Sequence, residues 1–103
     1  MLTDAGYQDY CDGESFRAAC YQPDEVVTIR LAHYGLMSHG RCHDVQYSGT
    51  GCYADVTGRL AAVCSGRRSC ELTVNSENLK ADSCEAAYPF FLNVSYSCTK
   101  GLN

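Results

Sequence analysis

Apolar and polar residues alternate most clearly over residues 26–32, which predicts a β-strand with one face in the core. Gly35 is predicted to end this strand in a sharp turn. Residues 36–50 then carry polar side chains and glycines without periodicity. A loop of that length in a small domain is expected to be functional, and its cysteines predict that it is ordered. The predicted core face of the strand consists of Val27, Ile29 and Leu31.

Three further segments, residues 15–20, 71–74 and 90–98, show the same alternation and are predicted strands. The last of them has the strongest pattern. The side chains predicted to face inward are Phe16, Ala18 and Cys20 in the first of these strands and Phe90, Leu92, Val94, Tyr96 and Cys98 in the last.

Residues 56–64 form the one convincing helical pattern, with Asp55 as the predicted N-cap and Ser65-Gly66 as the predicted C-terminal cap. Its apolar stripe consists of Val56, Leu60, Val63 and Cys64. Short strands, one main helix and long structured loops together predict an α+β fold, a compact, disulfide-stapled antiparallel β-sandwich.

Eight cysteines in 103 residues approach the density of a disulfide scaffold, and their even number predicts that all are paired. Cys64 and Cys70 flank a short turn and are expected to pair with each other. The sequence pattern leaves the other pairings open. Because disulfides persist in oxidising compartments, we expect a secreted protein or an extracellular domain.

The chain length fits a single domain, with residues 1–9 predicted to be a flexible N-terminal lead-in and residues 99–103 a C-terminal tail. The net charge of −4, without a basic stripe, argues against nucleic-acid binding. No apolar run approaches the roughly 20 residues of a membrane span, so we expect no membrane insertion.

The residue patterns do not favour an enzyme. The Gly-x-Ser-x-Gly elbow of a serine hydrolase is absent, and the cysteines are more useful as bridges than as nucleophiles. His33, His39, Cys42 and His43 lie close together in the sequence but lack the spacing of a structural zinc site. We therefore expect neither catalysis nor a metal nor another cofactor.

Asn93-Val94-Ser95 is an N-glycosylation sequon on the polar face of the last predicted strand. A glycan would require Asn93 to be exposed, whereas pairing with a neighbouring strand would hide it. The sequence leaves both outcomes open.

Five short motifs stand in step with the cysteines. They are Cys11-Asp12-Gly13, Ala32-His33-Tyr34-Gly35, Cys64-Ser-Gly-Arg-Arg-Ser-Cys70, Asp82-Ser83-Cys84 and Phe91-Leu92-Asn93-Val94-Ser95-Tyr96-Ser97-Cys98. In this order they resemble the galactose/rhamnose-binding lectin domain of the sea-urchin egg lectin type, which also occurs in latrophilins. The resemblance covers residues 10–98. It departs from the family pattern where Leu36 stands in place of the signature arginine, and Arg41 is nearby but out of register.

The resemblance implies both a set of disulfides and a sugar site. The implied bridges are Cys11–Cys42, Cys20–Cys98, Cys52–Cys84 and Cys64–Cys70. The implied site brings the Asp12 turn, the Tyr34 loop and the Asp82 loop to one pocket, where the two carboxylates accept hydrogen bonds from sugar hydroxyls and the tyrosine lies against the ring. The sugar-binding residues expected from it are Asp12, Glu14, His33, Tyr34, Gly35 and Asp82.

Two functions follow from this resemblance. The first is a non-enzymatic lectin module that binds galactose- or rhamnose-like sugars on glycans and glycoproteins, with several copies supplying avidity. The alternative is an extracellular protein–protein adhesion module on the same fold with a degenerate sugar site. The apolar residues Leu36, Met37, Tyr88, Phe90 and Phe91 would favour the alternative if they were exposed.

Overall fold

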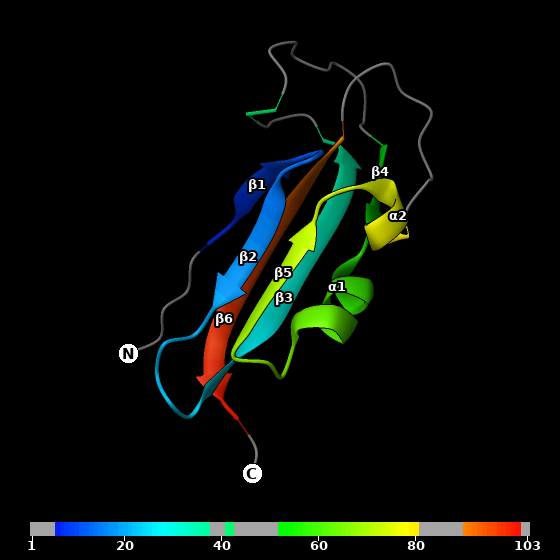
Figure 1. Cartoon of the computed structure of the whole chain (residues 1–103). Helices are drawn as coiled ribbons and strands as arrows, with labels where there is room; N and C mark the ends of the chain where they lie inside the picture. Colours follow the sequence, from blue (N-terminus) through cyan, green and yellow to red (C-terminus); the bar gives the residue numbers. More distant parts are fainter. Residues whose placement is uncertain (1–5, 38–40, 43–51, 81–89, 102–103) are drawn as a thin grey trace.

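Two antiparallel sheets and two helices make up the computed structural model, which describes residues 6–37, 41–42, 52–80 and 90–101 (Figure 1). The four-stranded sheet has the order β1 (Gln8–Cys11), β6 (Phe91–Lys100), β3 (Glu25–Leu36) and β4 (Cys52–Asp55). The two-stranded sheet pairs β2 (Ser15–Ala19) with β5 (Ser69–Thr73). The helices are α1 (Thr57–Cys64) and α2 (Ser76–Leu79). No helix among these residues is long and apolar enough to cross a membrane.

The pairing of β3 with β6 is the longest among the described strands and contains one irregularity. Ile29 lies opposite Tyr96 but Leu31 lies opposite Ser95, so β3 carries one extra residue, Arg30, at a β-bulge. Because side chains alternate between the faces of a strand, the extra residue exchanges the faces beyond it.

The bulge corrects one sequence prediction. Val27 and Ile29 are buried as expected, but Leu31 is only half-buried, and Ala32 and Tyr34 point into the core instead. The alternation predicted for a regular strand therefore holds only up to Arg30.

Gly35 does not end the strand, contrary to the sequence prediction. It pairs with Phe91 on one side and with Tyr53 on the other, and β3 continues to Leu36. Its φ is +148°, and a Cβ placed there would lie 2.4 Å from the carbonyl oxygen of Cys52. The glycine is needed because β4 approaches closely, rather than for a turn.

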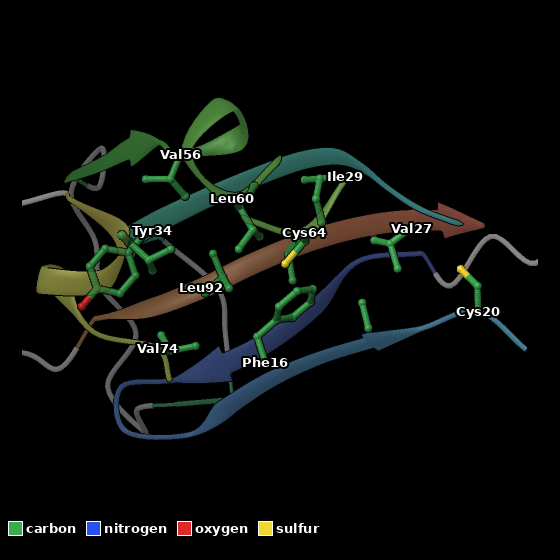
Figure 2. Packing of buried hydrophobic residues seen from close by; sticks show 14 residues of the cluster. Phe16, Cys20, Val27, Ile29, Tyr34, Val56, Leu60, Cys64, Val74 and Leu92 are labelled. Carbon is green, nitrogen blue, oxygen red and sulfur yellow. The ribbon is translucent and has the colours of Figure 1, made fainter. Parts of the chain in front are cut away.

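Side chains from both sheets and from α1 meet in one core (Figure 2). The side chains predicted to face inward in and just after β2 do so; they are Phe16, Ala18 and Cys20. Phe16 makes edge-to-face contacts with Tyr10 and Tyr96. In β6 and at Phe90 just before it, the predicted inward set holds: Leu92 and Val94 belong to the core, and Phe90, Tyr96 and Cys98 pack against it.

The helix predicted over residues 56–64 begins one residue later than expected. Val56 is the N-cap residue and makes no side-chain cap bond, while Asp55 Oδ1 accepts a hydrogen bond from the Thr57 N–H at 2.9 Å. The C-terminal cap at Ser65 is as predicted. The short helix α2, capped by the side chain of Asn75, is a second helix besides the one that the sequence predicted.

Three of the four predicted disulfides are confirmed: Cys11–Cys42, Cys20–Cys98 and Cys64–Cys70. Cys52 is disulfide-bonded, and Cys84, its expected partner, lies outside the described residues. The mainly antiparallel, disulfide-linked architecture is thus confirmed. Of the expected sandwich, the second sheet contains two strands among the described residues. The sequence predicted one main helix, and the described residues contain two helices, of which α1 is the longer. Gln8 and Asp9 of the expected lead-in belong to β1.

We predict that Gly35→Ala destabilises the fold by at least about 2 kcal/mol, because the new methyl group meets the backbone of β4 in a strained conformation. Thermal unfolding followed by circular dichroism would measure the effect. Gly58→Ala is the matched control, since nothing lies within 4 Å of the added Cβ and α1 should gain up to about 1 kcal/mol. Equal melting temperatures for the two variants would contradict the prediction.

Candidate functional site

The turn at residues 11–14 between β1 and β2 lies at the C-terminal end of β3, and backbone hydrogen bonds hold it there. The Asp12 N–H donates to the Phe90 carbonyl at 3.2 Å, and the Gly13 N–H donates to the Val74 carbonyl at 2.9 Å. Gly13 has a φ of +90°, which a glycine adopts without strain. The turn therefore presents Asp12 in a fixed and exposed position.

Tyr34 reaches this turn from inside the core. Tyr34 is only 2% exposed, and its ring packs edge-to-face against that of Phe90. Its hydroxyl nevertheless donates a hydrogen bond to Asp12 Oδ1 at 2.5 Å. Burial first, and the Asp12 carboxylate second, raise the pKa of Tyr34, so the phenol keeps its proton. In Figure 2 its oxygen points away from the core side chains. Tyr34 thus donates its hydroxyl to the exposed Asp12 while its ring packs inside.

Within the described part of the chain, few hydrogen bonds use the Asp12 carboxylate. The Tyr34 hydroxyl is the one side-chain donor to it among residues 6–37, 41–42, 52–80 and 90–101. A carboxylate can accept about four hydrogen bonds, so a ligand could use the remainder.

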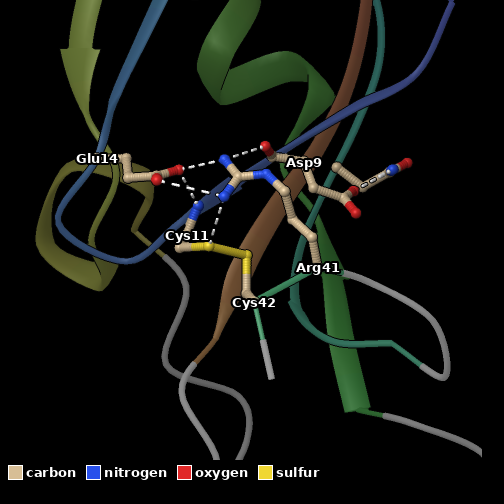
Figure 3. The surroundings of a disulfide bond; sticks show 6 residues. Asp9, Cys11, Glu14, Arg41 and Cys42 are labelled. Atoms are coloured by element: carbon tan, nitrogen blue, oxygen red, sulfur yellow. Dashed lines mark hydrogen bonds and ion pairs between the residues drawn. A yellow bond between two sulfur atoms is a disulfide. The ribbon is translucent and has the colours of Figure 1, made fainter. Parts of the chain in front are cut away.

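Glu14 differs, because Arg41 and the backbone occupy its carboxylate (Figure 3). Arg41 donates to both oxygens of Glu14, at 2.5 and 3.3 Å, and the Cys11 N–H donates to one of them at 2.8 Å. The same guanidinium donates to the Asp9 carbonyl and contacts Cys11 Sγ. Arg41 therefore ties β1, the turn and the Cys11–Cys42 bridge together.

His33 lies on the opposite face of the sheet from Tyr34, because adjacent residues of a strand point to opposite sides. It is the cross-strand neighbour of Asn93 and Asp55, and its ring centroid lies 4.9 Å from that of Tyr53. The structure brings Asp12, Tyr34 and Glu14 to one end of the core but places His33 apart from them.

The sequon residue Asn93 takes part in the sheet. It is half-buried, and its Nδ2 donates to Asp9 Oδ1 at 2.8 Å. Its neighbours on the same face, Phe91 and Ser95, are 0% and 6% exposed.

Several predicted residues lie outside the part of the chain that the structure describes. They are Asp82, His39 and His43. Cys42, the fourth member of the histidine-rich cluster, is in a disulfide. The sequence analysis did not predict a role for Arg41. Its position beside Cys42 was the available signal, because the Cys11–Cys42 disulfide brings this segment to the Asp12 turn.

We predict that the Glu14–Arg41 pair makes stability depend on acid pH. Hydrogen bonds from Arg41 and from the Cys11 N–H lower the pKa of Glu14 below its usual value of about 4.5. The contribution is therefore complete above that value and lost as the pH falls through the lowered pKa. Glu14→Gln and Arg41→Gln should each reduce the fall in melting temperature between about pH 5 and pH 3.

A double-variant cycle of these substitutions is the control for that measurement. The double variant should lose no more acid sensitivity than Glu14→Gln alone, because Glu14→Gln already removes the carboxyl that titrates. Independent, additive effects would contradict the pairing.

The family comparison agrees with the motifs found in the sequence. Residues 18–98 match the model of the D-galactoside/L-rhamnose binding SUEL lectin domain. The match includes Tyr34, all of β3, β4 and β5 and most of β6, but it begins after Asp12 and Glu14. Carbohydrate binding is the activity that this family's description states. Because the match spans most of the chain, this protein belongs to the SUEL lectin family.

Proposed function

We propose that the protein is a non-catalytic lectin module whose sugar site is centred on the Asp12 carboxylate. The observation that carries this proposal is the Tyr34–Asp12 hydrogen bond, which fixes an exposed carboxylate at the end of the core. A carboxylate with free acceptor sites suits the adjacent hydroxyls of galactose or rhamnose. Disulfides fit an extracellular location for such a module.

The remaining expected residues take different roles in this proposal. Asp82 supplies a second carboxylate, as the family resemblance implies. Glu14 acts through Arg41 to hold the turn in place, since its oxygens already have donors. Gly35 permits the approach of β4. The burial of the Tyr34 ring favours a role in orienting Asp12 over direct stacking on the sugar.

The adhesion alternative depends on an exposed apolar patch, and two of its members are not exposed. Leu36 and Phe91 are both 0% exposed, while Phe90 and Met37 are half-buried. Tyr88 lies outside the described residues. The carboxylate site therefore supports sugar binding better than it supports the alternative.

We predict that Asp12→Asn weakens binding of galactose or rhamnose by about tenfold or more, because hydrogen bonds to a charged acceptor are lost. The amide oxygen can still accept from Tyr34, so the melting temperature should change little. Isothermal titration or retention on a sugar matrix would measure the affinity. Asp82→Asn should have the same effect.

Glu71→Gln is the matched control, because it removes one carboxylate from an exposed ion pair with Arg17. Its sugar affinity should equal that of the unmodified protein. Unchanged binding in Asp12→Asn would disprove this site. A glycan array without hits, together with a defined extracellular protein ligand, would instead establish the adhesion function.

We also propose that Asn93 carries no glycan, because its amide bonds to Asp9 and its neighbours are buried. The intact mass of protein secreted from eukaryotic cells should therefore equal that of the polypeptide with its disulfides. A hexose-containing mass shift that disappears in Asn93→Gln would overturn this proposal.

A further inference from the structure

The end of the molecule remote from Asp12 contains a cavity of about 500 Å³. It lies where β3 begins and β6 ends (Figure 1). Eight residues of β3 separate Val26 from Tyr34, which corresponds to about 26 Å along the strand. The two places are therefore separate. The residues lining the cavity are Pro23, Asp24, Glu25, Val26, Thr28, Gly66, Arg68, Thr99, Lys100 and Gly101.

The framework of this cavity is held by backbone hydrogen bonds between three segments. The Gly101 N–H donates to the Asp24 carbonyl at 2.8 Å, which joins the end of β6 to the turn before β3. The Gly66 N–H donates to the Val27 carbonyl at 2.9 Å, and the Val27 N–H donates to the Arg67 carbonyl at 2.7 Å. The Cys20–Cys98 disulfide fastens the same region. A cavity framed in this way is largely pre-formed, as ligand sites usually are.

The charged side chains around the cavity balance. Asp24 and Glu25 oppose Arg68 and Lys100, although the whole chain has a net charge of −4. The Lys100 Nζ–Asp24 Oδ2 distance is 4.0 Å, and the two side chains are 83% and 63% exposed. Such a loose, solvated pair contributes little to stability and leaves both groups able to bond a ligand.

Two threonines add hydroxyl groups between the charges. The Thr28 and Thr99 hydroxyls lie 2.7 Å apart and share one hydrogen bond, so one hydroxyl hydrogen and several acceptor sites remain. Val26 and Pro23 supply apolar surface beside them. The lining thus contains donors, acceptors and apolar surface.

We propose that this cavity binds a neutral saccharide residue, as a second sugar site independent of the Asp12 site. An anion would meet Asp24 and Glu25, and a cation would meet Arg68 and Lys100. Several hydroxyls, each of which both donates and accepts, match the mixed set of groups, while their C–H surfaces suit Val26 and Pro23. A peptide amide offers fewer donors and acceptors in the same space. Two sites at opposite ends of β3 would let one domain engage two glycan branches.

Amide chemical shifts would test this proposal during titration with the methyl glycosides of galactose and rhamnose. We expect shifts at Thr28, Gly66, Lys100 and Gly101 that saturate independently of those at Gly13. Asp24→Asn should weaken binding at the cavity by about tenfold or more. Its folding should be unaffected, since the Asp24 backbone carbonyl, which binds Gly101, is retained.

Asp12→Asn and the control Glu71→Gln should leave the cavity shifts unchanged, so failure at one site is distinguishable from failure at the other. The proposal is overturned if the cavity amides do not respond up to about 100 mM glycoside, a concentration that saturates millimolar sites. It is also overturned if their response disappears in Asp12→Asn. A response to N-acetylneuraminic acid or sulfate, but to neither neutral glycoside, would replace the neutral ligand with an anion.

Discussion

The long antiparallel pairing between β3 and β6 is the constraint on which the other features depend. It runs from Glu25 opposite Lys100 to Gly35 opposite Phe91. One end of this pair frames the cavity proposed as a second sugar site, and the other end carries Tyr34 and Phe90 to the Asp12 turn. Both candidate sites therefore depend on one register, which buried side chains on the core face specify.

The bulge at Arg30 changes which residues of β3 face the core between one end of the strand and the other. Before it, Val27 and Ile29 face the core, and after it Ala32 and Tyr34 do so. In a strand without the extra residue, Tyr34 would lie on the face occupied by His33, and its hydroxyl could not meet Asp12 from inside the core. A single unpaired residue thus decides which aromatic side chain supports the candidate site.

A disulfide and polar contacts fix the segments around the candidate site that the sheet does not hold. The Cys11–Cys42 bridge fastens the segment containing Arg41 to β1, and the arginine then occupies the oxygens of Glu14. Among the described residues, Arg41 and the Cys11 N–H donate to Glu14, whereas Tyr34 is the one side-chain donor to Asp12. The Arg41 side chain is attached near, but not at, the position at which the family pattern has its arginine.

The sequence by itself determined the strands β2, β3, β5 and β6 but not β1 or β4, and it determined the main helix and its apolar stripe. It also determined the local Cys64–Cys70 bridge and, through short motifs, the lectin family. These features depend on nearby residues, whose period and spacing are visible in the chain. Only the tertiary structure decided that β3 continues through Gly35, that the Tyr34 side chain faces the core and that Arg41 forms an ion pair with Glu14. Each of these features requires a partner that is distant in the sequence. Gly35 pairs with β4, the orientation of Tyr34 depends on the bulge in the pairing with β6, and a disulfide brings Arg41 to Glu14. Local pattern cannot report such contacts, because they exist only once the strands are paired and the bridge is closed.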